Sequence, residues 1–359
     1  MKKLIVAIDS FKGCLSSMEA NEAAAKGIQM EMPDAEVIQI PVSDGGEGWT
    51  TAFHAALGGE LVETTVFDPM MRRITAKYLI QNDMAVIEIA QASGLTLLSA
   101  EERNPIRATS YGTGQLVGDA VRRGCKRIIV GLGGSATSDC GMGMLQAIID
   151  AFAKNQSWDE VTALEDVQFT IATDVQNPLC GENGAAYVFA PQKGATPEMV
   201  QSLDARAKRF AELSAKHFGY DCQDMPGAGA AGGLGYAFLQ YMHAECRPGI
   251  DLLLEAVNYE QQLKDVILVI TGEGSADRQT MMGKLPFGIL QKTKLFHIPV
   301  ALIAGRIKDD QQLLDAGFSL VKCINPQGMT IEEAMVPETA KRNIVETVRT
   351  ILGEILPSL

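Results

Sequence analysis

Side chains suited to phosphate chemistry are concentrated in one short stretch of the chain. Residues 266–289 read VILVITGEGSADRQTMMGKLPFGI and carry Glu273, Asp277, Thr280 and Lys284 after five apolar residues. An uninterrupted apolar run of this length predicts a parallel strand that is buried on both faces. Ligands of open α/β sheets bind at the loops that leave the carboxyl ends of the strands. Two carboxylates and a lysine in such a loop favour metal-assisted handling of a phosphate.

A glycine-rich loop, GLGGSATSDCG, follows another predicted strand at residues 127–132. Glycines, hydroxyls and the start of a helix are the features that hold a phosphate on backbone amides. The loop is neither GxxxxGK[ST] nor GxGxxG, and tight packing of a strand against a helix is the alternative explanation. The residues that we predict to bind phosphate or another anion here are Gly133, Gly134, Ser135 and Thr137.

A second glycine cluster, PGAGAAGGLG, spans residues 226–235 and precedes a predicted helix at 236–242. Gly232 and Gly233 are its candidate ligand-binding residues. The competing interpretation is that small residues here only allow two backbone segments to approach closely.

Four carboxylates follow predicted strands, and they could converge on Mg²⁺ or act as a base: Asp44, Asp174, Glu273 and Asp277. Carboxylates in loops more commonly cap helices or face solvent, so the group is better evidence than any one member. Lys12 and Lys284 each precede a predicted helix start, where phosphate charge is favoured. A solvated lysine is the alternative at both positions.

Arg107, in the segment NPIRATSYGTG, is a candidate for clasping a carboxylate with two hydrogen bonds, and a surface ion pair is its alternative. The four histidines have no serine or cysteine nucleophile motif around them, which disfavours hydrolytic triad chemistry. The seven cysteines form no CxxC pair and lie near no histidine, so neither a zinc site nor a disulfide framework is indicated.

The elements that must position these groups fall into two patterns. Strands at residues 4–8 and 37–40 flank a helix that begins with the Ser16/Glu19 capping box. The first of these strands leads into Asp9 and Ser10. The alternation of strand and helix returns with strands at 266, 300 and 320. These two pieces predict one doubly wound α/β sheet that is formed from both ends of the chain.

Between them, LVETTVF, ITAKYLI and AVIEIA alternate apolar and polar residues with short links, which predicts antiparallel strands in a different layer. We therefore expect two domains. Residues 1–64 and 260–359 form a discontinuous Rossmann-like or flavodoxin-like domain, and residues 65–259 form an inserted mixed α/β domain.

The composition narrows the class of protein. The 359 residues carry a net charge of −13, which disfavours a surface for nucleic acid or for anionic membranes. No apolar run approaches the roughly 18 residues of a membrane span, and the apolar part of the first ten residues is too short for a signal peptide. We expect a cytoplasmic protein with small-molecule substrates, and a homo-oligomer is left open.

These motifs together resemble those of the bacterial glycerate kinase family. The resemblance covers the chain from Lys2 to about Gly305 and lies in an ordered set: DSFKG, SDGGEG, NPIRATSYGTG, GLGGSATSDCG, DVQNPL, GAAYVFAPQKGA, GAGAAGGLG and TGEGSADRQTMMGK. It implies phosphorylation of D-glycerate by ATP with Mg²⁺, mainly to 2-phosphoglycerate. It also implies that the inserted domain has a restriction-enzyme-like fold. This chain departs from the family pattern at Thr173, where cysteine is frequent, and at Ser275, where arginine is frequent.

For such a reaction we expect Asp174 to be the general base, with Lys12, Asp277 and Lys284 also catalytic. The candidate metal ligands are Asp44, Asp174, Glu273 and Asp277. The remaining substrate- and nucleotide-binding candidates are Asp9, Ser10, Asp44, Arg107, Asn177 and Thr280, together with the glycine-loop residues named above. The alternatives are a kinase that acts on another small hydroxy acid or gives the 3-phosphate, an oxidoreductase that binds a nucleotide or flavin, and a regulator that senses an organic acid.

Overall fold

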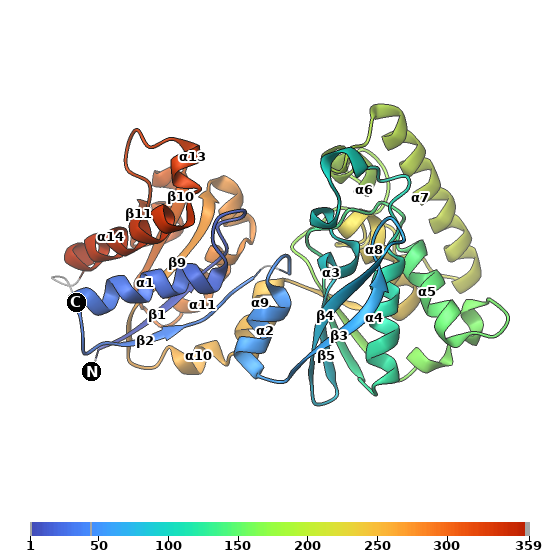
Figure 1. The fold of residues 1–359 in the computed structure, drawn as a ribbon, viewed down its shortest axis with the longest axis horizontal. Coiled ribbons are helices and arrows are strands. Elements are labelled where there is room, and N and C mark those ends of the chain that lie inside the picture. Colours follow the sequence, from blue (N-terminus) through green and yellow to red (C-terminus); the bar gives the residue numbers. More distant parts are fainter. Residues whose placement is uncertain (1, 44, 356–359) are drawn as a thin grey trace. The chain divides into compact units, whose positions relative to one another are not determined.

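The computed structural model describes residues 2–43 and 45–355, and the chain divides into two compact units (Figure 1). Met1–Ser43 and Ile250–Leu359 form one, which we call the split unit, and Asp44–Gly249 form the other, the inserted unit. Both divisions come earlier than the 64/65 and 259/260 seams that the sequence suggested. The first boundary lies at 43/44 instead of 64/65 because α2 (Trp49–Leu57) packs on strands β4 and β5 of the inserted unit.

The split unit contains a five-stranded sheet in which every pair of neighbours is parallel. Its order is β11-β10-β9-β1-β2, which becomes 2-1-3-4-5 when strands are counted within the unit. That is the flavodoxin-like order of a doubly wound sheet. The predicted α/β class and the closure of one sheet from both ends of the chain are therefore confirmed. The strands are β1 (Lys3–Ile8), β2 (Glu36–Gln39), β9 (Val266–Ala276), β10 (Val300–Ile307) and β11 (Leu320–Cys323).

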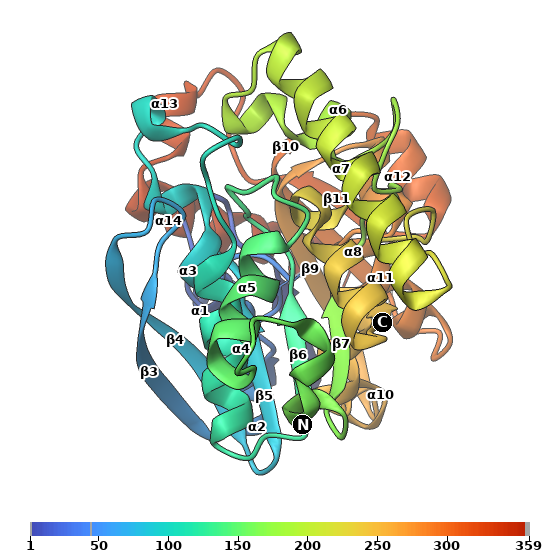
Figure 2. The same cartoon turned by 90° about the vertical axis from the view of Figure 1, so that its right-hand side faces the viewer.

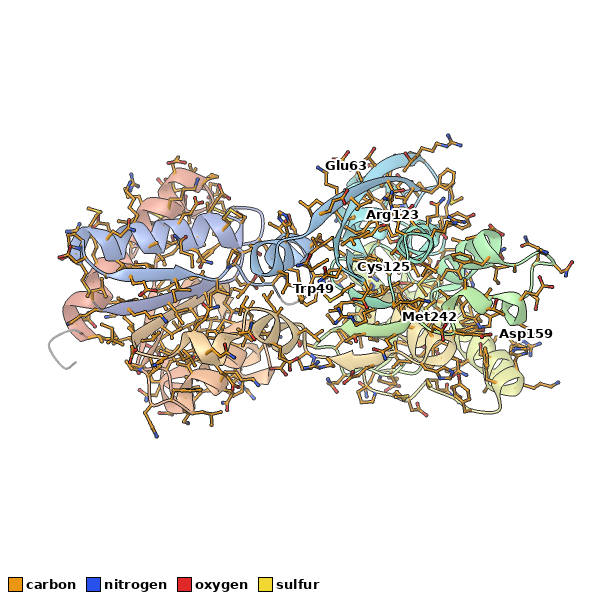
Figure 3. The ribbon with its side chains drawn as sticks, turned by 90° about the horizontal axis from the view of Figure 1, so that it is seen from below. Trp49, Glu63, Arg123, Cys125, Asp159 and Met242 are labelled. Atoms are coloured by element: carbon orange, nitrogen blue, oxygen red, sulfur yellow. The ribbon has the colours of Figure 1, made fainter. Side chains whose placement is uncertain are left out.

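Helices cover both faces of this sheet (Figure 3). On one face, α1 (Ser17–Glu31) and α14 (Pro337–Ile355) pack together, and a Cβ added at Gly27 would press on the backbone of Val345. The predicted Ser16/Glu19 capping box starts α1. On β9 and β10 lies α11 (Leu285–Lys294). The shorter helices of this region are α9 (Gly249–Ala256), α10 (Tyr259–Gln262), α12 (Asp310–Ala316) and α13 (Ile331–Ala334), with the 3₁₀ helix η6 (Arg278–Met282).

The buried side chain of Asn21 joins the ends of two strands in the split unit. Its Oδ1 accepts the amide of Ile8 at 2.9 Å, and its Nδ2 donates to the carbonyl of Ile40 at 2.9 Å. Ser17 Oγ makes a parallel link, since it donates to the Ile8 carbonyl at 2.5 Å and accepts the Val42 amide at 2.9 Å. The segments that leave β1 and β2 are thus fixed at their starting points.

The inserted unit contains a six-stranded mixed sheet in the order β3 to β8. The first three strands are antiparallel, as their alternating pattern predicted, and β5 to β8 are parallel. The strands are β3 (Glu60–Phe67), β4 (Arg73–Gln81), β5 (Met84–Glu88), β6 (Arg127–Gly131), β7 (Gln168–Ala172) and β8 (Glu245–Arg247). The likeness to a restriction-enzyme fold stays a prediction.

Helices pack on this sheet (Figure 2). The large core of the inserted unit includes Leu116, Met144, Phe169 and Phe238. Leu116, Met144 and Phe238 come from the helices α4 (Tyr111–Arg122), α5 (Met142–Phe152) and α8 (Ala230–Met242), whereas Phe169 comes from strand β7. Helix α7 (Pro197–Phe218) packs against α6 (Ala185–Phe189). The start of α8 is not helical, because residues 231–233 have left-handed backbone angles. Among the described residues, no helix is long and apolar enough to cross a membrane.

Candidate active site

The first candidate region lies at the switch point of the split unit, where β2 follows on one side of β1 and β9 lies on the other. The amide of Asp9 donates to the carbonyl of Gly272 at 2.9 Å, so the segments that leave β1 and β9 begin side by side. The doubly wound fold binds ligands at this kind of position. The structure therefore brings Asp9, Ser10 and Lys12 to the edge that Glu273 also occupies.

Glu273 is the most buried carboxylate of this region, with 8% of the residue exposed. It lies inside β9 and opposite Ala304 of β10, so the prediction that it belongs to a loop was wrong. The strand continues past Gly272 because β10 supplies partners as far as Ala276. Glu273 Oε1 accepts a 2.6 Å hydrogen bond from Thr280 Oγ1, and Oε2 lies 3.8 Å from Lys284 Nζ.

Burial raises the pKa of Glu273, and the charge of Asp277 also raises it. The hydrogen bond from Thr280 and the positive charges of Lys284 and Lys12 act in the opposite direction. The cause that dominates is desolvation, which disfavours the carboxylate form. A cation placed beside this carboxylate would therefore lower its pKa and relieve the cost of its charge.

Asp277 and Lys284 mark the beginnings of two short elements. Asp277 caps η6, since its Oδ1 accepts the Gln279 amide at 2.8 Å while its own amide donates to Thr280 Oγ1 at 3.0 Å. Lys284 is the N-cap residue of α11, with Pro286 in the first turn. The lysine side chain is 38% exposed, so its ammonium is available at a helix start that favours anions.

Of the four carboxylates that the sequence suggested as metal ligands, Glu273 and Asp277 lie in this region. Among residues 2–43 and 45–355, no three side chains of the His, Cys, Asp or Glu type cluster as a metal site would require. Mg²⁺ commonly takes one or two carboxylates and completes its shell with water and substrate phosphates. The pair fits that limited role, and Asp44, the other candidate ligand in the early part of the chain, lies outside the described residues.

The second candidate region is the carboxyl edge of the parallel strands in the inserted unit. Glu88, Gly131, Ala172 and Arg247 are paired in register across β5 to β8. The loops after these strands therefore leave the sheet at one level. They include the glycine loop after β6 and the segment that reaches Asp174 two residues after β7.

The glycine loop packs directly on the SDGGEG motif. The amide of Gly133 donates to the Gly45 carbonyl at 3.0 Å, and a Cβ at Gly133 would collide with Gly46 Cα. A Cβ at Gly45 would likewise lie 2.9 Å from the Ala172 carbonyl. Glycine is needed at Gly45 and Gly133 for this close approach, so two motifs that are far apart in the sequence form one surface at the strand ends.

Gly232 and Gly233 support the same loop from inside the inserted unit. Both have left-handed backbone angles, with φ of 68° and 89°, and Gly232 contacts the Thr137 carbonyl while Gly233 contacts Cys140. The Cys140 amide donates to the Gly232 carbonyl at 3.1 Å. These contacts match the alternative that the sequence left open, close backbone approach, and a ligand-binding role for the two glycines stays a prediction.

Glu88 was missed by the sequence reading. The residue is 3% exposed and ends β5, where its Oε2 lies 3.5 Å from the Thr50 amide at the start of α2. Burial raises the pKa of Glu88 to about 7, and the charge of Glu47 adds to the increase, while hydrogen bonds from the amides of Thr50 and Gly48 oppose it. Its signal in the sequence is an acid within the apolar run AVIEIA.

The other predicted residues of the inserted unit lie in loops. Asp174 is half-buried after β7, and Asn177 Nδ2 donates to the Asn183 carbonyl at 2.8 Å. Arg107 is exposed, and its guanidinium forms no hydrogen bond or ion pair with another residue of the described chain. A common crevice for Lys12, Asp174 and Asp277 stays a prediction, as do the roles of all these side chains.

Comparison with known proteins gives one consistent result. The model of the Glycerate kinase family matches residues 4–356. The chain is 40% identical to the glycerate kinase of Bacillus subtilis (strain 168), over 98% of this chain and 97% of that one. It is 39% identical to the glycerate 2-kinase of Escherichia coli (strain K12), over 98% of both. A crystal structure assigned as glycerate kinase 2 from Salmonella typhimurium LT2 superposes with a TM-score of 0.83 at 36% identity, and the match covers 99% of both chains.

Proposed function

Because the chain belongs to the glycerate kinase family, and is therefore a kinase, we propose that it transfers the γ-phosphoryl group of ATP to the 2-hydroxyl of D-glycerate. The products are 2-phosphoglycerate and ADP. The observation that carries the proposal is the match along nearly the whole chain to a relative named glycerate 2-kinase. The two candidate regions supply the chemistry that such a reaction needs.

In this reaction the oxygen of the 2-hydroxyl forms a bond to the γ-phosphorus as the bond between that phosphorus and the β,γ-bridging oxygen breaks. The hydroxyl proton passes to a base, and ADP carries away the electron pair of the broken bond. Little covalent chemistry is required of the protein, so positioning and neutralisation of charge provide most of the acceleration.

We assign the polyphosphate to the switch point of the split unit. Lys284 presents an ammonium at the start of α11, and Lys12 acts on Glu273 through its charge, so both cations lie near the same carboxylate. Mg²⁺, when bound, would neutralise phosphate oxygens. Glu273 and Asp277 are the residues here that would hold it, and Thr280 fixes Oε1 of Glu273 through its hydroxyl.

We assign substrate orientation and proton transfer to the inserted unit. Asp174, after β7, is our candidate base for the glycerate hydroxyl, since a carboxylate at a strand end can accept that proton at neutral pH. Arg107 has an exposed guanidinium, which is suited to binding the glycerate carboxylate with two hydrogen bonds. We also propose a cytoplasmic location, where ATP is available and the seven free cysteines would stay reduced.

The experiment that tests the proposal is release of ADP from ATP and Mg²⁺ in the presence of single hydroxy acids. D-glycerate should support turnover, whereas L-glycerate, glycolate and D-lactate should support little. Chelation by EDTA should abolish the rate, and an excess of Mg²⁺ should restore it. Equal or faster turnover with another acid would identify that acid, and not glycerate, as the substrate. Absence of ADP release with all of these acids would contradict the proposed reaction.

A further inference from the structure

The side chain of Lys193 is buried beneath the glycine loop of the inserted unit. It is 3% exposed and lies at the end of the 3₁₀ helix η5 (Pro191–Lys193), in the PQKGA segment. Its Nζ donates to Ser135 Oγ at 2.7 Å and to the Thr137 carbonyl at 2.6 Å. Neither acceptor is charged. Burial of an ammonium without a carboxylate partner costs free energy, so the position of Lys193 calls for an explanation.

The glycine loop above Lys193 has donors that the protein does not use. The hydroxyls of Thr137 and Ser138 are buried and have no hydrogen-bond partner among the described residues, and these residues are 0% and 6% exposed. The loop also has amides that donate to no other described residue, namely those of Gly134, Ser135, Thr137, Ser138 and Asp139. Unused donors of this density indicate a ligand that accepts hydrogen bonds, and a phosphate or carboxylate has that property.

The hydrogen bond from Lys193 determines whether the Ser135 hydroxyl is a donor or an acceptor in this pair. An ammonium group can only donate, so Ser135 Oγ is the acceptor in this pair. The proton of Ser135 is then left for a second acceptor. The same ammonium fixes the Thr137 carbonyl, which also rests on Gly232. Lys193 therefore holds the loop at two points and orients one of its hydroxyls as a donor.

We propose that Lys193 is a positioning residue for an oxyanion that binds on residues 133–138. It places positive charge beneath the loop and directs the Ser135 hydroxyl at the ligand. This inference rests on the proposed function, since that reaction has two sources of oxyanions, the phosphates of ATP and the carboxylate of glycerate. The shared chemistry is an anionic oxygen that accepts hydrogen bonds from amides and hydroxyls.

Binding of an anion should be coupled to uptake of a proton. Burial lowers the pKa of Lys193 to about 7, and the charge of Asp139 partly opposes this, as the one charged group that acts on it among the described residues. Both oxygens of Asp139 are occupied, with Oδ2 accepting the amide and hydroxyl of Ser110 and the amide of Gly143, and Oδ1 accepting the amide of Gly141. A bound anion favours the ammonium form, so the ligand should weaken as pH rises above 7.

Isothermal titration calorimetry measures this coupling without any turnover. ADP and D-glycerate are titrated separately at pH 7.5 into wild type, Lys193→Met and the exposed control Lys154→Met, each in two buffers of different ionisation enthalpy. Wild type and the control should take up a fraction of a proton with one of the two ligands. Lys193→Met should bind that ligand at least tenfold more weakly without proton uptake, and should bind the other ligand normally.

The ligand that shows the coupling identifies the source of the oxyanion. A folded Lys193→Met protein with wild-type affinity for both ligands and wild-type proton uptake would overturn the proposal. If Lys193→Met does not fold, Ser135→Ala decides. It should retain proton uptake but bind the same ligand about tenfold more weakly, and wild-type affinity in that variant would overturn the proposal. Failure of the kinase assay alone, with anion binding intact, would count against the proposed reaction and not against Lys193.

Discussion

Replacing Glu88 with glutamine should make the inserted unit more stable at neutral and alkaline pH. Glu88 is 3% exposed at the end of β5 and receives amides from the start of α2. Glutamine has nearly the same shape and its carbonyl oxygen still accepts one of these amides, but it carries no charge to desolvate. Glu88→Gln therefore removes the desolvation cost of the buried carboxylate while it keeps a hydrogen bond from the start of α2.

The magnitude follows from the pKa of Glu88, which rises from 4.5 to about 7 on folding. A folded-state pKa above the unfolded value means that the folded protein binds the extra proton, so stability is fully present below pH 4.5 and falls as pH rises to 7. At 1.36 kcal/mol per pKa unit, the whole shift lowers the free energy of unfolding by about 3.4 kcal/mol. About 2.5 kcal/mol of this loss falls between pH 5 and pH 8, because the rest lies outside that range. Glu88→Gln should lose none of it, so its advantage over wild type should grow by that amount.

Urea unfolding followed by tryptophan fluorescence measures this effect, because both tryptophans, Trp49 and Trp158, lie in the inserted unit. The free energy of unfolding of wild type and Glu88→Gln is compared at pH 5, 6.5 and 8. Glu165→Gln, which removes an exposed carboxylate of the same unit, is the control and should follow wild type. A constant difference between Glu88→Gln and wild type across this range would refute the reasoning.

Three further predictions address the candidate regions. Gly232→Ala should destabilise the inserted unit by roughly 2 kcal/mol or more in urea unfolding, because its Cβ would collide with the Thr137 carbonyl. Gly181→Ala, with a similar positive φ but open space, should lose only about 1 kcal/mol, and equal losses would contradict the contact. Asp174→Asn should lower kcat about 100-fold while ATP affinity persists, and near-normal turnover would remove Asp174 as the base. Lys284→Ala should raise the KM for ATP about tenfold, and an unchanged KM would remove Lys284 from the nucleotide site.

Local patterns predicted the strands of both sheets except β8, because each of the others is a short apolar or alternating run. The run at residues 266–270 identified β9, but the polar residues after Gly272 concealed its continuation, which depends on pairing with β10. The flavodoxin-like order was suggested by alternation of strands and helices, whereas the division at 43/44 depends on where α2 packs. Packing partners that are distant in sequence decide these points, and no local pattern contains them.

The residues of the candidate site were likewise only partly predictable from the sequence. The glycine loop and the carboxylates after strands were visible in the sequence because their residue types are unusual for their positions. Glu88 and Lys193 were missed because an acid in an alternating strand and a lysine in a polar segment both usually face solvent. Their burial results from α2 in one case and from the glycine loop in the other. Only the folded chain shows that each lies at a candidate site.

The central claim, transfer of phosphate from ATP to the 2-hydroxyl of glycerate, is tested most directly by ³¹P NMR of the reaction of the protein with ATP, Mg²⁺ and D-glycerate. We predict stoichiometric appearance of ADP and 2-phosphoglycerate, identified by coupling of the phosphorus to the single proton on C2. A phosphorus signal coupled to the two protons on C3 would contradict the assigned position, and ADP with inorganic phosphate alone would contradict phosphoryl transfer to glycerate.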